Sequence, residues 1–84
     1  MTVTVYSTAF CPFCTMAKRL LTGRGIEFAE VRVDDDFEKR KWLIEATGQR
    51  TVPQIFIGDE SIGGFQELAA LDRSGGLGEK LAAI

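Results

Sequence analysis

Phe10-Cys11-Pro12-Phe13-Cys14 contains both cysteines of the 84-residue chain. It follows a short strand pattern at residues 2–6 and precedes a helical pattern at about residues 12–22. A Cys-x-x-Cys motif between a strand and a helix places its first sulfur over the exposed N–H groups of the first helical turn. Because these groups and the helix dipole stabilise an anion, we expect the Cys11 thiol to ionise more easily than a free cysteine.

Cys14 lies one turn after Cys11 on the same helix face, close enough for the two thiols to form a short disulfide. Pro12 fits the first helical turn, where a missing N–H costs little. We therefore interpret the motif as a thiol–disulfide redox site. A structural zinc site is the weaker interpretation, because it normally takes four ligands and this chain offers two cysteines and no histidine unless chains pair.

The composition predicts one small domain over residues 1–84, with a hydrophobic content of 45% that suffices for a core. A net charge of −2 provides no electrostatic footprint for nucleic acid. The sequence shows neither an apolar stretch that could span a bilayer nor a secretion signal, so we expect a cytoplasmic protein with no membrane partner. In that reducing compartment a Cys-x-x-Cys motif is more often catalytic or metal-binding than structural.

The other elements follow from apolar periodicity and from the positions of glycine and proline. We expect a second strand at 27–33, a helix at about 36–47, a hairpin of strands at 54–57 and 60–62, a helix opened by Gly63-Gly64, and a short last helical segment at 77–84. The order β-α-β-α-β-β-α, plus the short C-terminal helix, predicts an α/β fold with a four-stranded mixed sheet and helices on both faces.

The middle of the chain has two predicted apolar faces. Ala29, Val31 and Val33 share one face of the second strand, and Phe37, Leu43, Ile44 and Ala46 form the apolar stripe of the second helix. The acidic run Asp34-Asp35-Asp36 between these elements is interpreted as the cap of that helix, in preference to a cation site, because three adjacent carboxylates cannot all converge on one ion.

Three motifs in this order and spacing resemble those of glutaredoxins, most closely the small bacterial dithiol kind. They are Cys11-Pro12-Phe13-Cys14, Thr51-Val52-Pro53 and Ile62-Gly63-Gly64, and the resemblance covers essentially the whole chain. It implies a thioredoxin-like fold and the reduction of disulfides, particularly protein–glutathione mixed disulfides, with glutathione as the electron donor. It further implies that Cys11 is the nucleophile and Cys14 the resolving thiol.

The resemblance also implies a glutathione site beside a cis peptide bond between Val52 and Pro53. The backbone of Val52 would pair with the cysteine portion of glutathione. The N–H groups after the double glycine would bind its γ-glutamyl carboxylate, and Arg40 its glycine carboxylate. The implied glutathione-binding residues are Phe13, Arg40, Thr51, Val52, Pro53, Gly64, Phe65 and Gln66.

Three positions depart from the family pattern. Phe13 replaces a common tyrosine, and Thr8 replaces a lysine that many relatives carry before the first cysteine. Gln66-Glu67 stands where an aspartate commonly contacts the amino group of the ligand, and the longer Glu67 is a candidate substitute. These differences bear on affinity and rate rather than on the type of reaction.

The partners implied by the resemblance are glutathione and proteins that carry glutathionylated cysteines or disulfides, with ribonucleotide reductase as a candidate. We expect a monomer that contains no metal and does not bind nucleic acid. One alternative function is a redoxin that receives electrons from thioredoxin reductase and passes them to ribonucleotide reductase. Iron–sulfur cluster carriage ranks lower, because a proline after the first cysteine, here Pro12, tends to disfavour it in the family.

Overall fold

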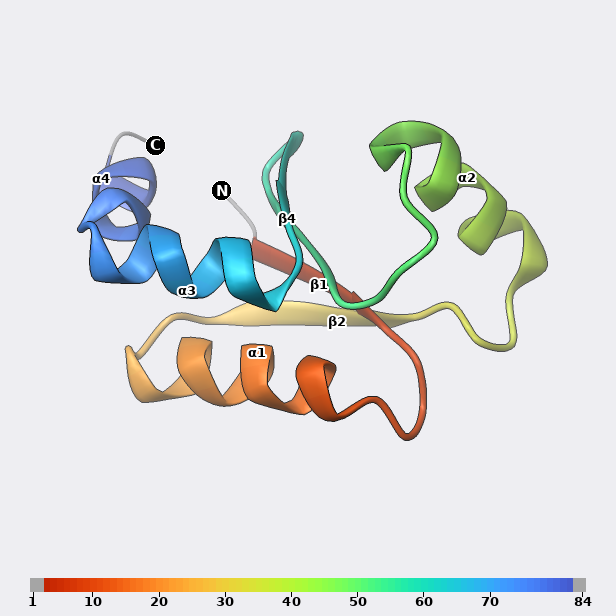
Figure 1. Ribbon diagram of the computed structural model, residues 1–84, viewed down its shortest axis with the longest axis horizontal. Helices are drawn as coiled ribbons and strands as arrows, with labels where there is room; N and C mark the ends of the chain where they lie inside the picture. The colour runs from red at the N-terminus through yellow and green to blue at the C-terminus, as the bar shows by residue number, and fades with distance from the viewer. Residues whose placement is uncertain (1–2, 83–84) are drawn as a thin grey trace.

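The computed structural model describes residues 3–82, and its elements follow the predicted order (Figure 1). The strands are β1 (Val3–Ser7), β2 (Phe28–Arg32), β3 (Gln54–Ile57) and β4 (Glu60–Gly63). The helices are α1 (Pro12–Gly23), α2 (Phe37–Thr47), α3 (Phe65–Arg73) and α4 (Gly76–Ala82). Thr2 and Ile84, which we assigned to the first strand and the last helical segment, lie outside the described residues.

The four strands form one mixed sheet in the order β2-β1-β3-β4. β1 runs parallel to β2, with Val5 opposite Glu30, and antiparallel to β3. β3 and β4 form the predicted antiparallel hairpin. β1 is one of the two central strands, and the loop that follows it leads to the cysteines at the start of α1.

The main core lies between the sheet and the helices α1, α3 and α4, with α2 on the other side of the sheet (Figure 1). Both strands at the centre of the sheet contribute to it, and each of the three helices adds at least one leucine. Its buried members are Val3, Val5, Ala17, Leu21, Ile55, Ile57, Leu68 and Leu77. Leu81 packs against this cluster, as predicted for the last helical segment.

α2 attaches to the sheet mainly through aromatic contacts. The ring of Trp42 lies 5.6 Å from that of Tyr6 and 5.9 Å from that of Phe56, between ring centroids. The expectation that Phe37 belongs to the buried stripe of this helix is wrong, since its side chain is 82% exposed. Phe37 and the buried Leu43 lie about 120° apart around the helix axis, so they do not share one face.

The predicted inner faces of β2 and α2 need two further corrections. Ala29 is exposed, because β2 is an edge strand and α2 covers the sheet farther in, at Tyr6. Ala46 is exposed as well. The predicted cap of α2 is confirmed, since the Asp36 carboxylate accepts a hydrogen bond of 2.9 Å from the Lys39 N–H. Within residues 3–82, no helix is both long and apolar enough to cross a membrane.

Candidate active site

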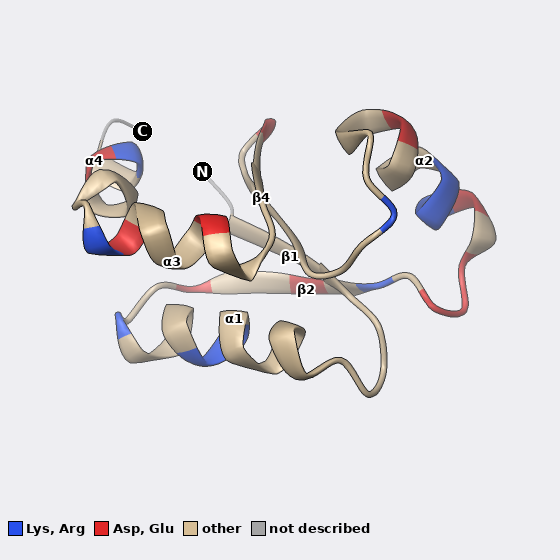
Figure 2. Ribbon diagram, in the orientation of Figure 1, with Lys and Arg blue, Asp and Glu red and all other residues tan. Residues whose placement is uncertain are grey.

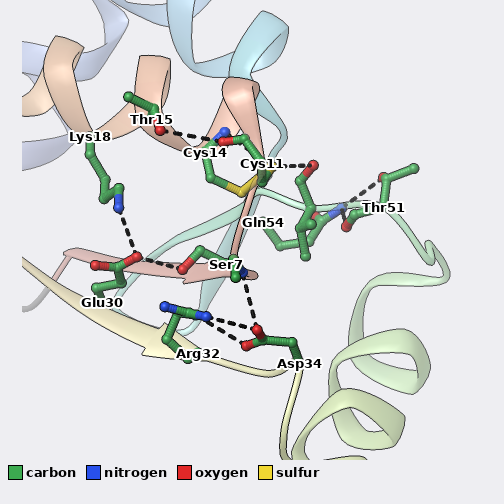
Figure 3. Close-up of a disulfide and its surroundings, with 12 residues drawn as sticks. Ser7, Cys11, Cys14, Thr15, Lys18, Glu30, Arg32, Asp34, Thr51 and Gln54 are labelled. Carbon is green, nitrogen blue, oxygen red and sulfur yellow. Dashed lines mark hydrogen bonds and ion pairs between the residues drawn. A yellow bond between two sulfur atoms is a disulfide. The ribbon is translucent and has the colours of Figure 1, made fainter.

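The two cysteines lie at the start of α1, after the loop that follows β1, and their sulfurs are joined in a disulfide (Figure 3). Cys11 is the N-cap residue of α1, and its Sγ accepts a hydrogen bond of 3.2 Å from the Cys14 N–H. Pro12 is at the start of the helix, as predicted. The first sulfur therefore lies over the N-terminus of α1, as the motif requires for stabilising a thiolate.

The two sulfur-bearing residues differ in exposure. Cys14, in the first turn of α1, is 2% exposed, whereas Cys11 is partly exposed. An incoming molecule can therefore reach Cys11 but not Cys14, while the two cysteines remain within bonding distance of each other. This asymmetry suits a pair in which one sulfur meets the substrate and the other acts only on its neighbour.

The peptide bond between Val52 and Pro53 is cis, as predicted. The carbonyl oxygen of Val52 lies 3.7 Å from Cys11 Sγ. Behind this turn, the buried side chain of Gln54 donates to the Thr51 carbonyl at 2.9 Å and to the Thr51 hydroxyl at 3.3 Å. Sequence reasoning missed this role of Gln54. The available signal was an amide side chain at the start of an otherwise apolar strand.

A groove of about 320 Å³ opens beside this turn. Its walls come from the start of α1, the turn before β3 and the start of α3. It is lined by Phe13, Thr51, Val52, Pro53, Gly64, Phe65, Gln66 and Glu67. Every predicted glutathione-binding residue except Arg40 thus lies around one hollow, although the residues come from three separate parts of the sequence.

Glu67 lies at the α3 end of this groove, where its Oε1 accepts a hydrogen bond of 2.8 Å from the Gly64 N–H. The carboxylate therefore provides one half of a capping box at the N-terminus of α3, since Gly64 has no side chain to provide the other half. The rings of Phe13 and Phe65, which also line the groove, lie 6.2 Å apart between centroids. The N–H of Gly64, the second residue of the double glycine, is therefore already occupied within the chain.

Arg40 lies apart from the groove, on α2. Its guanidinium donates a hydrogen bond of 3.2 Å to the carbonyl of Arg50, which directly precedes Thr51. Together with Phe37, Lys41 and Ile44 it lines a separate hollow. Figure 2 shows the basic residues of α2 and of the loop leading to β3 on the same side of the molecule. Arg40 therefore borders the groove only through the loop to which it binds.

A second hollow, of about 500 Å³, lies beside the disulfide and is lined by both cysteines. Its charged lining residues are Lys18, Glu30 and Arg32, and they take part in two ion pairs that sequence reasoning did not find. Lys18 pairs with Glu30 at 2.9 Å, and Arg32 pairs with Asp34 at 2.7 Å (Figure 3). Hydrogen bonds from the Ser7 hydroxyl and from Lys18 hold the pKa of Glu30 below its usual range.

Comparison with known proteins agrees with this arrangement. The family model for glutaredoxin matches residues 3–62. A glutaredoxin from Neisseria meningitidis serogroup A is 51% identical over 77 residues, which cover 90% of this chain and 91% of that protein. The chain belongs to the glutaredoxin family. It is accordingly a thiol–disulfide oxidoreductase, and its fold is the thioredoxin-like one predicted from the sequence.

Further relatives support the same assignment for this glutaredoxin. Glutaredoxin 3 of Escherichia coli K12 is 45% identical over 75 residues, covering 89% of this chain and 90% of that protein. Wheat glutaredoxin has a TM-score of 0.90 and 38% identity, covering 99% of this chain and 81% of that chain. The buckwheat glutaredoxin–glutathione complex has a TM-score of 0.88 and 31% identity, covering 96% of this chain and 76% of that chain.

Proposed function

We propose that this glutaredoxin reduces protein–glutathione mixed disulfides and protein disulfides with glutathione as the electron donor. Cys11 is the nucleophile and Cys14 the resolving thiol. The observation that carries the proposal is the position of Cys11 Sγ, 3.7 Å from the Val52 carbonyl at the edge of the groove. A glutathione sulfur in that groove would lie next to the reachable one of the two cysteines.

The groove offers a complementary surface to each part of glutathione. The backbone of Val52 can pair with the cysteine portion, as in the addition of a short strand. The N–H groups of Phe65 and Gln66, which open α3, suit the γ-glutamyl carboxylate. Arg40 is proposed to reach the glycine carboxylate at the other end, beyond the loop at Arg50 to which it binds. The buckwheat glutaredoxin that was crystallised with glutathione supports this choice of ligand.

The reaction with a glutathionylated protein proceeds by two thiol–disulfide exchanges. The Cys11 thiolate attacks the glutathione sulfur, an S–S bond forms between them, and the protein cysteine leaves as a thiolate that takes up a proton. A second glutathione thiolate then attacks the sulfur of the bound glutathione, releasing glutathione disulfide and the Cys11 thiolate. The N–H of Cys14, which already points at Cys11 Sγ, stabilises that thiolate as it departs.

A protein disulfide requires Cys14 as well. The Cys11 thiolate attacks one substrate sulfur, and the other leaves as a thiol after protonation. Cys14 then attacks Cys11 Sγ, which frees the second substrate thiol and leaves the disulfide that the structure contains. Two glutathione molecules restore the dithiol and are oxidised to one glutathione disulfide. This cycle needs a pool of reduced glutathione, in agreement with the cytoplasmic location expected from the sequence.

The test is turnover of the mixed disulfide of glutathione and cysteine, coupled to glutathione reductase. We expect turnover that depends on glutathione, its loss in Cys11→Ser and its retention in Cys14→Ser. Activity in Cys11→Ser would overturn the assignment of the nucleophile. Absence of turnover with glutathione, together with rapid reduction of the Cys11–Cys14 disulfide by thioredoxin reductase, would overturn glutathione as the donor.

A further inference from the structure

Phe10, which directly precedes Cys11, has an unusual conformation. The residue is fully exposed, and its φ angle is 55°. Among residues 3–82 it is the sole residue other than glycine with a positive φ. The left-handed region is unfavourable for a bulky side chain, and exposure of a phenyl ring to water is unfavourable too. Such a combination persists only where the surrounding structure enforces it, and it favours a functional explanation.

The surrounding loop does enforce this conformation. The N–H of Ala9 donates a hydrogen bond of 3.1 Å to Asp34 Oδ2. Asp34 is itself held by two hydrogen bonds from Arg32, of 3.0 Å and 2.7 Å (Figure 3). On the other side of Phe10, Cys11 is fixed as the N-cap of α1. The exposed ring is thus attached between two anchored residues.

The ring borders the hollow beside the disulfide rather than the proposed glutathione groove. Phe10 lines the hollow of about 500 Å³ together with Cys11, Cys14 and the ion pair of Lys18 and Glu30. The groove of about 320 Å³ has no lining residue in common with it. Two separate surfaces therefore flank Cys11, and the residues proposed to bind glutathione lie on one of them.

We propose that Phe10 and the hollow beside it bind the polypeptide of a protein substrate, through an apolar side chain next to the substrate's reactive cysteine. This inference rests on the proposed function in one respect, that Cys11 is the nucleophile. A substrate cysteine joined to Cys11 places its neighbouring residues beside Phe10, because Phe10 and Cys11 are adjacent in the chain. Glutathione in the other groove does not use this contact.

The contact can be measured as an equilibrium in a Cys14→Ser background, where the mixed disulfide cannot be resolved. A peptide thiolate attacks Cys11 Sγ of the glutathionylated protein, one S–S bond forms, another breaks, and glutathione leaves as a thiol after protonation. The exchange involves no net oxidation. Its equilibrium constant therefore compares the peptide and glutathione as partners of the same sulfur.

The probes are two blocked pentapeptides, Gly-Leu-Cys-Leu-Gly and Gly-Ser-Cys-Ser-Gly. With Phe10 present we expect the leucine peptide to be favoured by about fivefold over the serine peptide, because the ring and the leucine side chain leave water together. Phe10→Asn should reduce this preference to about twofold or less, since asparagine tolerates the left-handed backbone but removes the ring. Phe37→Asn is the matched control, because Phe37 is equally aromatic, is 82% exposed and lies on α2.

The outcomes separate the two proposals. An unchanged leucine preference in Phe10→Asn, or an equal loss in Phe37→Asn, would overturn the role of Phe10 and leave the proposed function standing. Failure of Cys11 to form a mixed disulfide with glutathione or with either peptide would overturn the proposed function and this inference with it. Turnover of the glutathione–cysteine mixed disulfide should be unchanged in Phe10→Asn. A loss of this turnover as large as the loss of the leucine preference would show that Phe10 serves the glutathione reaction instead.

Discussion

Lys18 Nζ lies 2.9 Å from Glu30 Oε2, and the Ser7 hydroxyl donates to the same oxygen at 2.6 Å (Figure 3). Lys18 stands one turn after Cys14 on α1, and both Lys18 and Glu30 line the hollow that contains the cysteines. A lysine in that position would favour a thiolate if it acted alone. The carboxylate of Glu30 instead balances its charge, so the ion pair as a whole contributes little field at the sulfurs.

We expect Glu30→Gln to make Cys11 more acidic. The glutamine keeps an acceptor for Ser7 but removes the negative charge, which leaves the charge of Lys18 unbalanced beside the thiols. The pH at which half of the Cys11 thiol is ionised should fall by about half a unit, a small shift because both side chains are partly solvated. The measurement is the ultraviolet absorbance of the thiolate against pH in the reduced protein.

Two variants control this result. Lys18→Met should move the midpoint of ionisation upward, because Glu30 then acts on the thiols without its partner. Glu45→Gln removes the same charge from an exposed position on α2 and should leave the midpoint unchanged. If the midpoint of ionisation fell by the same amount in Glu45→Gln, the net charge of the protein, and not the pair with Lys18, would be responsible for the shift.

Gly63 combines a positive φ of 108° with a crowded site. An added Cβ would lie 2.8 Å from Glu67 Oε1 and 2.9 Å from Glu67 Cγ, so the cap of α3 would have to move. We expect Gly63→Ala to lower the free energy of unfolding by about 2 kcal/mol. Gly78 lies within α4, has open space around the same position and should gain about 0.5 kcal/mol as alanine. Urea unfolding measures the stability of both variants. An equal change in the free energy of unfolding would contradict the role given to the positive φ and the crowding at Gly63.

The sequence predicted those parts of the site that depend on local signals. The cysteine motif, the proline turn and the double glycine each mark the end of an element, and a thioredoxin-like order of elements brings such ends together. Every predicted residue of the groove except Arg40 was found around it for this reason. The cap of α2 by Asp36 was equally predictable, because it depends on residues three positions apart.

Contacts between distant residues were not predictable in the same way. Ser7 and Glu30 meet because β1 and β2 pair in one particular register, and the sequence does not state that register. The exposure of Phe37 was missed because its hydrophobicity suggests a buried position, whereas no part of residues 3–82 buries its side of α2. Arg40 likewise binds a carbonyl of the following loop, a contact that only the packing of α2 decides.

Trp42 fastens α2 to the sheet, and its removal should loosen that helix. Trp42 packs against Tyr6 and Phe56 while remaining 46% exposed. We expect Trp42→Ala to lower the free energy of unfolding by about 2 kcal/mol, less than for a fully buried tryptophan. Circular dichroism during urea unfolding measures the change. Phe37→Ala on the same helix should change stability by no more than about 0.5 kcal/mol, and a larger loss there would contradict the assigned contacts.

The contact between Asp34 and the loop before Cys11 should stabilise the protein less at acid pH. Two hydrogen bonds from Arg32 and one from the Ala9 N–H hold the pKa of Asp34 well below its usual value of 3.8. Because the folded chain binds this proton less readily than the unfolded chain, the contribution of Asp34 to stability is complete above about pH 4 and is lost as the pH falls further. Asp34→Asn should reduce the loss of stability between neutral and acid pH, measured by urea unfolding. An identical pH dependence in the variant would contradict this role.

Arg40 provides the most direct test of how far the glutathione site extends beyond the groove. If its guanidinium binds the glycine carboxylate, Arg40→Ala should raise the KM for glutathione by about threefold to tenfold and leave kcat unchanged, because the interaction is the same in the ground and transition states. Lys41→Ala is the matched control, since it removes the neighbouring positive charge on α2 without touching the Arg50 carbonyl. Steady-state kinetics over a range of glutathione concentrations give both constants. An equal rise of the KM in the two variants would show that Arg40 acts only through general charge attraction. An unchanged KM in both variants would show that α2 does not take part in binding glutathione.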